Sequence, residues 1–144
     1  MQPLLDGLIA RVCSDAVLAQ TVGGAPTVYL DQAPETTGMP FMTLHIAATA
    51  PGPAGAHDFA GDRMTHSALT LTAVADALST ALAMADRLTA LLDAAVFPLS
   101  AGVLLDCRQM AAPQPLLAGF DAANDEVYRV EVKFVCTVFE SAGR

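Results

Sequence analysis

Residues 127–139 read VYRVEVKFVCTVF, and their pattern decides the fold class of the chain. Apolar and polar side chains alternate with a period of two, which predicts a strand with one buried face and one face in water. The face predicted to be buried consists of Tyr128, Val130, Val132, Phe134, Cys136 and Val138. The other face carries Arg129, Glu131, Lys133 and Thr137, but Val135 and Phe139 make it partly apolar. Such a face is one expectation for a subunit that packs on copies of itself.

Three more segments predict strands by alternation and β-branched content: residues 41–48, 64–74 and 103–110. Apolar residues recur at helical spacing in residues 2–13 and 16–21, and again in residues 76–94. Ser14 or Asp15 is placed to cap the second short helix, and Asp76 the long one. We therefore expect an α+β fold in one domain over residues 1–144, with an antiparallel sheet of about four strands and two helices packed on one face.

The composition narrows the class of protein. Of the 144 residues, 53% are apolar and 15% are charged, which is enough apolar material to bury a core. No apolar run reaches the length of a membrane span, and the first residues lack the basic start of a signal peptide. The formal net charge of −8 argues against a surface that binds nucleic-acid phosphates. We expect a protein made in a cytoplasm that does not enter a membrane.

No motif in the chain predicts catalysis. Phosphate-binding, dinucleotide-binding and nucleophile-elbow motifs are absent from the sequence, so we expect no enzyme activity and no cofactor. Asp106 and Arg108 share a strand face and are expected to form a surface ion pair. Cys13, Cys107 and Cys136 are far apart in sequence and predict three small buried apolar side chains.

Metal binding is the other chemistry considered. His57, Asp58, Asp62 and His66 lie in or beside a Gly- and Pro-rich loop that nothing in the sequence orders, so we expect no metal site. His45 and His66 lie on two strands that are expected to pair, which leaves a neighbourhood of two histidines open.

Residues 50–63, APGPAGAHDFAGDR, form a connection too long for a hairpin turn. Prolines restrict this loop and glycines keep it pliable, while Phe59 and Arg63 are residue types enriched at interfaces. We predict a protruding arm that binds a neighbouring subunit or partner. Its contact residues are expected to be His57, Asp58, Phe59, Asp62 and Arg63, with Phe59 as the apolar anchor. An idle insertion is the alternative.

Four stretches together resemble the tail-completion, or tail-terminator, proteins of long-tailed bacteriophages and related phage-like particles. They are SDAVLAQTVGG (residues 14–24), VYLDQAPETTGMPFMTLHI (28–46), SALTLTAVADALSTALAMADRLTALLDAA (67–95) and YRVEVKFVCTVF (128–139). The resemblance runs in order from Leu4 to Phe139. One departure is LTLTAVAD (69–76), where the family often has aromatic residues before its long helix.

The resemblance implies a structural virion protein, assembled in a host bacterial cytoplasm. Such a subunit forms a ring of six that caps the tail tube, ends tube polymerisation and joins the tail to head-side connector proteins. DNA passes through the lumen without specific binding, which suits an acidic chain. Two alternatives remain: a head–tail connector or adaptor of the same particle, and a small-ligand-binding domain with a pocket between helices and sheet.

Overall fold

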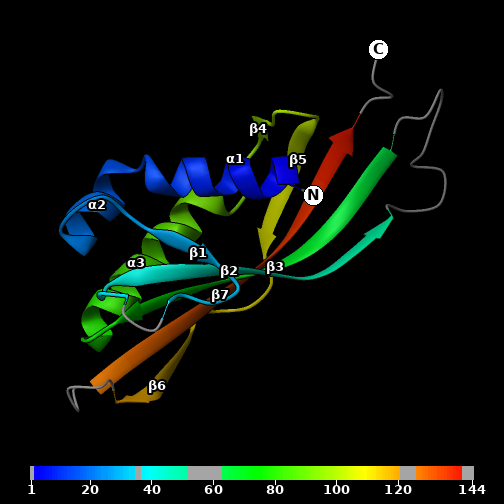
Figure 1. The fold of residues 1–144 in the computed structure, drawn as a ribbon. Coiled ribbons are helices and arrows are strands. Elements are labelled where there is room, and N and C mark those ends of the chain that lie inside the picture. The colour runs from blue at the N-terminus through cyan, green and yellow to red at the C-terminus, as the bar shows by residue number, and fades with distance from the viewer. Residues whose placement is uncertain (1, 35–36, 52–62, 121–125, 141–144) are drawn as a thin grey trace.

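The computed structural model describes residues 2–34, 37–51, 63–120 and 126–140 (Figure 1). These residues form three helices: α1 (Gln2–Cys13), α2 (Ala16–Val22) and α3 (Leu78–Leu92). They also form seven strands: β1 (Val28–Leu30), β2 (Phe41–Pro51), β3 (Arg63–Ala75), β4 (Phe97–Pro98), β5 (Val103–Gln109), β6 (Gln114–Phe120) and β7 (Glu126–Glu140). In the described part of the chain, no helix combines the length and the apolar character needed to cross a bilayer.

The strands form one sheet in the order β1-β2-β3-β7-β5-β4. β3 pairs with β7 along its whole length, from Arg63 opposite Glu140 to Ala75 opposite Tyr128. The other edge of β7 is shared, because β5 pairs with its second half and β6 with its first half. The long alternating segment therefore lies at the centre of the sheet and contacts three other strands.

The predicted fold class is wrong in strand number, helix number and strand direction. The sheet has seven strands rather than about four and is mixed, because β1 runs parallel to β2. Three helices replace the expected two, since α1 and α2 are separate elements. α2 ends at Gly23, whose φ of 77° is the left-handed conformation that glycine favours at a helix end.

The strands β4 and β6 were not predicted from the sequence, each for a physical reason. β4 has only two residues, too few to show a periodic pattern. β6 lies in a segment that reads as a loop because of Pro113, Pro115 and Gly119. In β6, Pro115 is paired opposite Val130, and Gly119 follows an irregularity in the register. Proline is tolerated in a strand at the edge of a sheet, and an irregularity accommodates glycine, so composition alone was misleading here.

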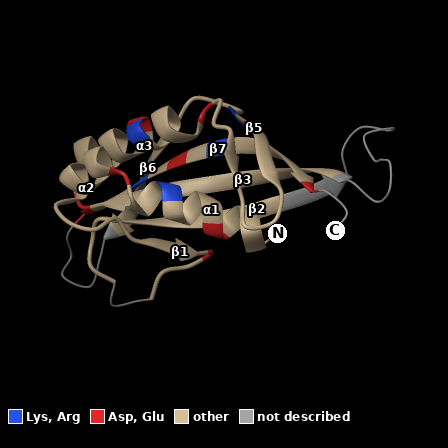
Figure 2. Ribbon diagram, turned by 90° about the horizontal axis from the view of Figure 1, so that it is seen from above, with Lys and Arg blue, Asp and Glu red and all other residues tan. Residues whose placement is uncertain are grey.

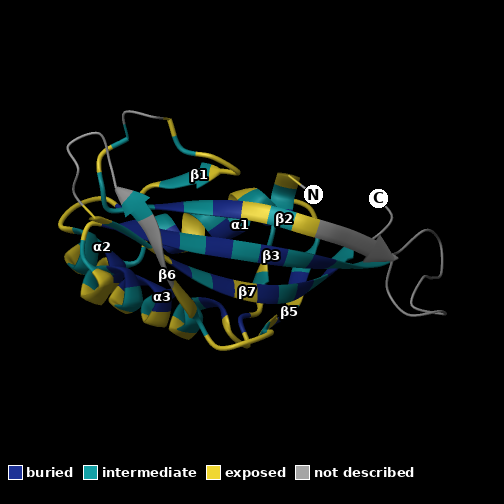
Figure 3. Cartoon of the chain, turned by 90° about the horizontal axis from the view of Figure 1, so that it is seen from below, coloured by how far each residue is buried: buried dark blue, intermediate teal, exposed yellow. Residues whose placement is uncertain are grey.

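The helices cover one face of the sheet (Figures 1 and 3), and the core lies between these two layers. The alternation predicted for β7 is confirmed on this side, because Val130, Val132 and Phe134 are fully buried. The α3 stripe that meets the sheet consists of Ala81, Met84, Ala85, Leu88 and Leu92. The α1 stripe consists of Leu4, Leu8 and Val12.

The helix starts differ from one another. Asp15 caps α2, since its Oδ2 accepts a hydrogen bond from the Leu18 backbone N–H at 2.8 Å. The same carboxylate binds the guanidinium of Arg87 on α3 through two contacts of 2.8 and 2.7 Å. The cap predicted for Asp76 is wrong, because α3 begins one residue later than that cap requires and Ala77 occupies the cap position without a side-chain hydrogen bond.

Candidate functional site

The sheet face turned away from the helices carries the polar side of the alternation. Directly opposed residues of paired strands share a face, so the register defines rows of neighbouring side chains across β2, β3 and β7. Three consecutive rows are Phe41–Val74–Arg129, Thr43–Thr72–Glu131 and His45–Thr70–Lys133. We call these nine residues the open face.

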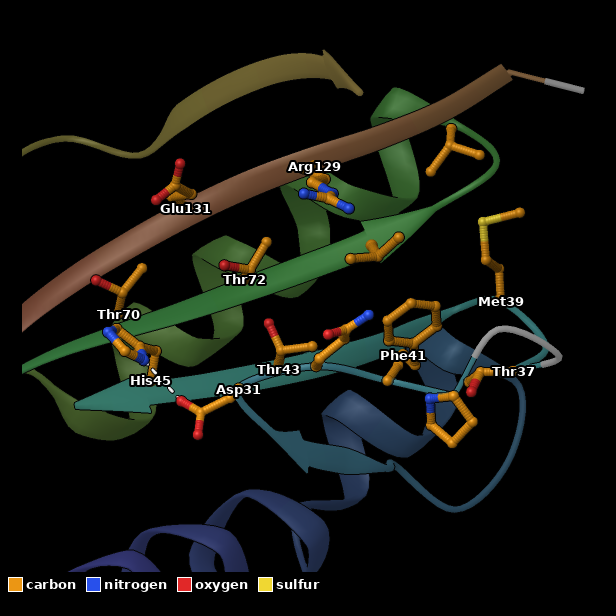
Figure 4. Close-up of a pocket in the computed structure, with 15 residues that line it drawn as sticks. Asp31, Thr37, Met39, Phe41, Thr43, His45, Thr70, Thr72, Arg129 and Glu131 are labelled. Carbon is orange, nitrogen blue, oxygen red and sulfur yellow. Dashed lines mark hydrogen bonds and ion pairs between the residues drawn. The ribbon is translucent and has the colours of Figure 1, made fainter. Parts of the chain in front are cut away.

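A groove of about 700 Å3 lies over the open face (Figure 4). Its floor includes Thr43, Thr70 and Thr72, whose side chains point to the same side of the sheet. Its wall comes from the segment between β1 and β2, including Asp31 and Met39. The groove is therefore a surface formed by three strands of the sheet, β2, β3 and β7, and the loop that follows β1.

One ion pair ties the loop to the sheet at the polar end of the groove. Asp31 Oδ1 lies 2.6 Å from Nδ1 of His45. Both side chains are largely exposed, at 74% and 58% respectively, so water screens the pair and it adds little stability. Asp31 also has a φ of 61°, in the left-handed region. The pair therefore positions the start of the loop rather than holding the fold together.

The other end of the groove is apolar. The rings of Tyr29 and Phe41 meet edge to face, with centroids 6.0 Å apart. Val74 is only 4% exposed although it faces away from the helices, and it lies outside the main core. Met39 lines the groove beside Phe41 (Figure 4). The open face thus combines a small apolar patch with a row of hydroxyl groups.

Charges on the open face alternate in sign. Arg129, Glu131 and Lys133 follow one another along the outer side of β7. Figure 2 shows acidic and basic residues interspersed on β7 and α3. Mixed charges, hydroxyl groups and an apolar patch are the composition of a protein–protein contact surface rather than of a phosphate-binding groove.

Among the described residues, no three His, Cys, Asp or Glu side chains are grouped closely enough to hold a metal ion. His45 lies opposite Thr70, four residues along β3 from His66. His66 instead contacts Oγ1 of Thr137 through its Nδ1, at 2.9 Å. The two histidines therefore do not form the neighbourhood that the sequence left open.

Most of the contact residues predicted for the long loop lie outside the described residues, namely His57, Asp58, Phe59 and Asp62. Arg63 begins β3, opposite Glu140, so it belongs to the sheet rather than to the loop. Pro51 is also paired, opposite Thr65, so the hairpin continues past the predicted strand end. Proline fits there because β1 covers only residues 42–44 of β2 and leaves the rest of that edge unpaired.

The predictions for Asp106, Arg108, Cys107 and Cys136 are confirmed, whereas the burial predicted for Cys13 is wrong. Arg108 Nε donates to Asp106 Oδ2 at 2.8 Å on the surface, as expected. Cys107 and Cys136 are fully buried, whereas Cys13 is partly exposed. Sequence reasoning singled out the outer side of β7 as a contact surface but missed that β2 and β3 extend it into the open face. The available signal was the hydroxyl side of residues 69–73 combined with the charged side of β7.

Comparison with known proteins adds a structural relative. No protein-family model matches the chain, and no curated protein matches its sequence. A chain from a structure described as "Virion of native gene transfer agent (GTA) particle" has a similar fold, with a TM-score of 0.62 and 19% sequence identity. The similarity covers 92% of this chain and 91% of that chain. At this identity the comparison establishes a shared fold over nearly the full length of both chains.

Proposed function

We propose that this chain is a structural protein of a phage or phage-like virion. The observation that carries the proposal is the structural similarity over 92% of this chain and 91% of a chain from a gene transfer agent virion. Similarity that spans both chains almost completely involves the whole domain rather than a common supersecondary motif. The sequence resemblance to tail-terminator proteins points in the same direction.

The specific role we propose is a ring of six subunits that caps the tail tube, ends its polymerisation and connects to head-side proteins. A closed ring needs two complementary patches on each subunit, joined head to tail. The open face, with its apolar end and its alternating charges, is suited to be one of them. The net charge of −8 suits a lumen through which DNA passes without binding.

The loop between β2 and β3 is proposed as a second contact, on sequence grounds alone. Replacing residues 52–62 by a short Gly-Ser turn should leave the melting of the subunit nearly unchanged, because this segment is rich in glycine and alanine and has one large apolar residue, Phe59. The shortened protein should fail to close rings or to cap tubes. Normal termination by the shortened protein would show that the loop is an idle insertion.

The ligand-binding alternative is less favoured by the geometry. It requires a pocket between helices and sheet, whereas the groove of about 700 Å3 lies on the face turned away from the helices. The connector alternative predicts the same class of protein at another position in the particle, so it is distinguished by location.

The proposal is tested by imaging purified particles that contain this chain with a small tag. Density for the tag should lie at the head-side end of the tail tube, in six equivalent positions. A ring on the head side of the neck would identify a connector instead. A position without ring symmetry would contradict the proposal.

A matched pair of variants tests the open face directly. Thr72→Arg places a cation in its central row, and Ala83→Arg places the same cation on an exposed position of α3. Mass photometry and negative-stain images, with tube ends present, should show loss of rings for Thr72→Arg only. Equal ring formation by both variants would remove the open face from the interface.

A further inference from the structure

Two cysteines face each other across the centre of the sheet. Cys107 on β5 is paired directly opposite Cys136 on β7. Both are free and fully buried, and their Sγ atoms are 3.1 Å apart. On the other side of β7, Cys136 lies opposite the buried Ser67 of β3. The pair therefore belongs to the core and does not line the groove.

The positions satisfy the geometric requirements of a disulfide. Directly opposed residues of antiparallel strands have Cα atoms about 4.5–5.5 Å apart, whether or not they are hydrogen-bonded. Disulfides span Cα separations of about 4.4–6.8 Å. The two sulfurs need to approach by only about 1 Å to reach bonding distance, which small side-chain rotations provide.

We propose that Cys107 and Cys136 are a site of oxidative modification, where a cross-strand disulfide forms and fastens β5 to β7. The oxidant is a small-molecule disulfide such as oxidised glutathione. One protein thiolate attacks it and releases one glutathione, which leaves a mixed disulfide on the protein. The second protein thiolate displaces the other glutathione and completes the Cys107–Cys136 bond. Two protein thiols are oxidised, their two protons pass to the two glutathione thiolates, and one small disulfide is reduced to two thiols.

The reaction needs a local opening of the sheet, and the position of β5 permits one. On its outer side, among the described residues, β5 pairs with the two residues of β4 and is otherwise held by the Ala94 N–H, which donates to the carbonyl of Cys107, and by Asp93 Oδ1, which accepts from the Gln109 N–H at 2.9 Å. Its ladder with β7 is irregular between Leu104 and Asp106, next to Cys107. The hydrogen bond with Cys107 and burial raise the pKa of the Cys136 thiol well above its ordinary value. The closed fold therefore holds little thiolate, and oxidation proceeds at the rate at which this edge opens.

The disulfide has a direct effect on stability. It closes a loop between positions 29 residues apart, which contains β6 and most of β7. Closing a loop of this length restricts the unfolded chain and raises the melting temperature by roughly 5–10 °C for a domain of this size. If the chain is a virion protein, as proposed above, reducing cytoplasm keeps the thiols free during assembly, and the bond forms after release.

The test uses the full chain with Cys13→Ser, which removes the partly exposed third thiol and leaves the pair intact. The protein is incubated with excess oxidised glutathione at mildly alkaline pH, with and without a brief warming that opens β5. Intact mass should fall by two hydrogen atoms, and peptide mapping should link Cys107 to Cys136. The melting temperature should rise by roughly 5–10 °C and return after reduction.

The double variant Cys13→Ser/Cys107→Val is the control, and its melting temperature should not respond to the oxidant. Persistence of two free thiols after repeated warming in oxidant would overturn the proposal. A stable glutathione adduct on either cysteine would do the same, as would a bond that leaves the melting temperature unchanged or lowered. None of these readouts depends on ring formation, so the result stands apart from the proposed role in a virion.

Discussion

The two faces of the sheet are built from alternate residues of the same strands, yet they have different surroundings. On β3, Leu69 and Leu71 are 1% exposed, while Thr70 between them is partly exposed on the open face. Helices α1 and α3 cover the first face, whereas among the described residues the second is bordered by the loop after β1 and by the segment before β6. The comparison indicates that the helix-covered face contributes most of the buried apolar area of the domain, while the open face carries polar and partly exposed side chains.

The largest expected effect comes from placing a charge on the covered face. Phe134→Asp puts a carboxylate at a fully buried position opposite Leu69, where it has no cation to pair with. An unpaired buried charge costs several kcal/mol, which is a large part of the roughly 5–15 kcal/mol that stabilises a domain. We expect loss of cooperative thermal unfolding, measured by circular dichroism.

The neighbouring position supplies the control for that comparison. Lys133→Asp places the same carboxylate one residue away, on the exposed side of β7. It should shift stability by no more than about 0.5 kcal/mol. Similar melting of both variants would mean that the two faces do not differ as described.

The next largest effect is expected at Gly102, which lies close to the end of β7. Gly102 has a φ of 94°, and a Cβ added there would lie 2.5 Å from the backbone oxygen of Phe139. Gly102→Ala therefore combines backbone strain with a contact that no side-chain movement relieves, and should cost about 2–3 kcal/mol. Urea unfolding measures this cost.

Gly24→Ala is the matched control for the glycine test. No atom lies within 4 Å of the position that its Cβ would take. We expect it to change the free energy of unfolding by less than about 0.5 kcal/mol. Equal costs at the two glycines would rule out the close approach at Gly102.

A smaller effect is expected at the junction of α2 and α3, on the covered side. Asp15→Ala removes the cap of α2 and the partner of Arg87, and should cost about 1–2 kcal/mol at neutral pH. Hydrogen bonding to Arg87 lowers the pKa of Asp15 in the folded chain. A carboxyl group whose pKa is lower in the folded chain than in the unfolded chain stabilises the fold. This stabilisation is complete above the unfolded pKa of about 3.9 and is lost as the pH falls through the folded pKa.

The difference in stability between parent and Asp15→Ala should therefore narrow as the pH falls below about 4, measured by urea unfolding across pH. Asp76→Asn is the control, because Asp76 makes no cap to α3. It should change stability by less than about 0.5 kcal/mol. A difference in unfolding free energy between the parent and Asp15→Ala that stays constant down to the lowest pH would contradict a stabilising contribution from the ionised Asp15 carboxylate.

The smallest effect on the isolated subunit is expected on the open face. Thr72→Arg lies between Thr43 and Glu131, where the new cation meets a carboxylate rather than an apolar core. Its unfolding free energy should stay within about 0.5 kcal/mol of the parent, even if assembly is lost. A large loss of stability would mean that the open face contributes to the core of the subunit.

Strand and helix positions were predictable where the pattern was long. β7 alternates over more than a dozen residues, so its buried side could be predicted directly. The apolar repeat of α3 predicted most of its buried side, although Leu78 is exposed and Met84 is buried instead. β4 could not be predicted because its two residues are too few to show a periodic pattern. β6 could not be predicted because it contains a proline, which a strand tolerates only at the edge of a sheet. Of the candidate contact residues, only Arg63 falls within the described chain, and it is paired in β3.

By itself, the sequence determined which side of each long strand is apolar and where the long helix runs. It also lacks the phosphate-binding, dinucleotide-binding and nucleophile-elbow motifs. The first two properties are local, since they depend on a repeat of two or 3.6 residues within one segment. Only the tertiary structure decided that β1 joins in parallel, that β5 and β6 share one edge of β7, and that Cys107 meets Cys136. Such pairings join residues distant in sequence, and no local pattern specifies which strand edge will find which partner.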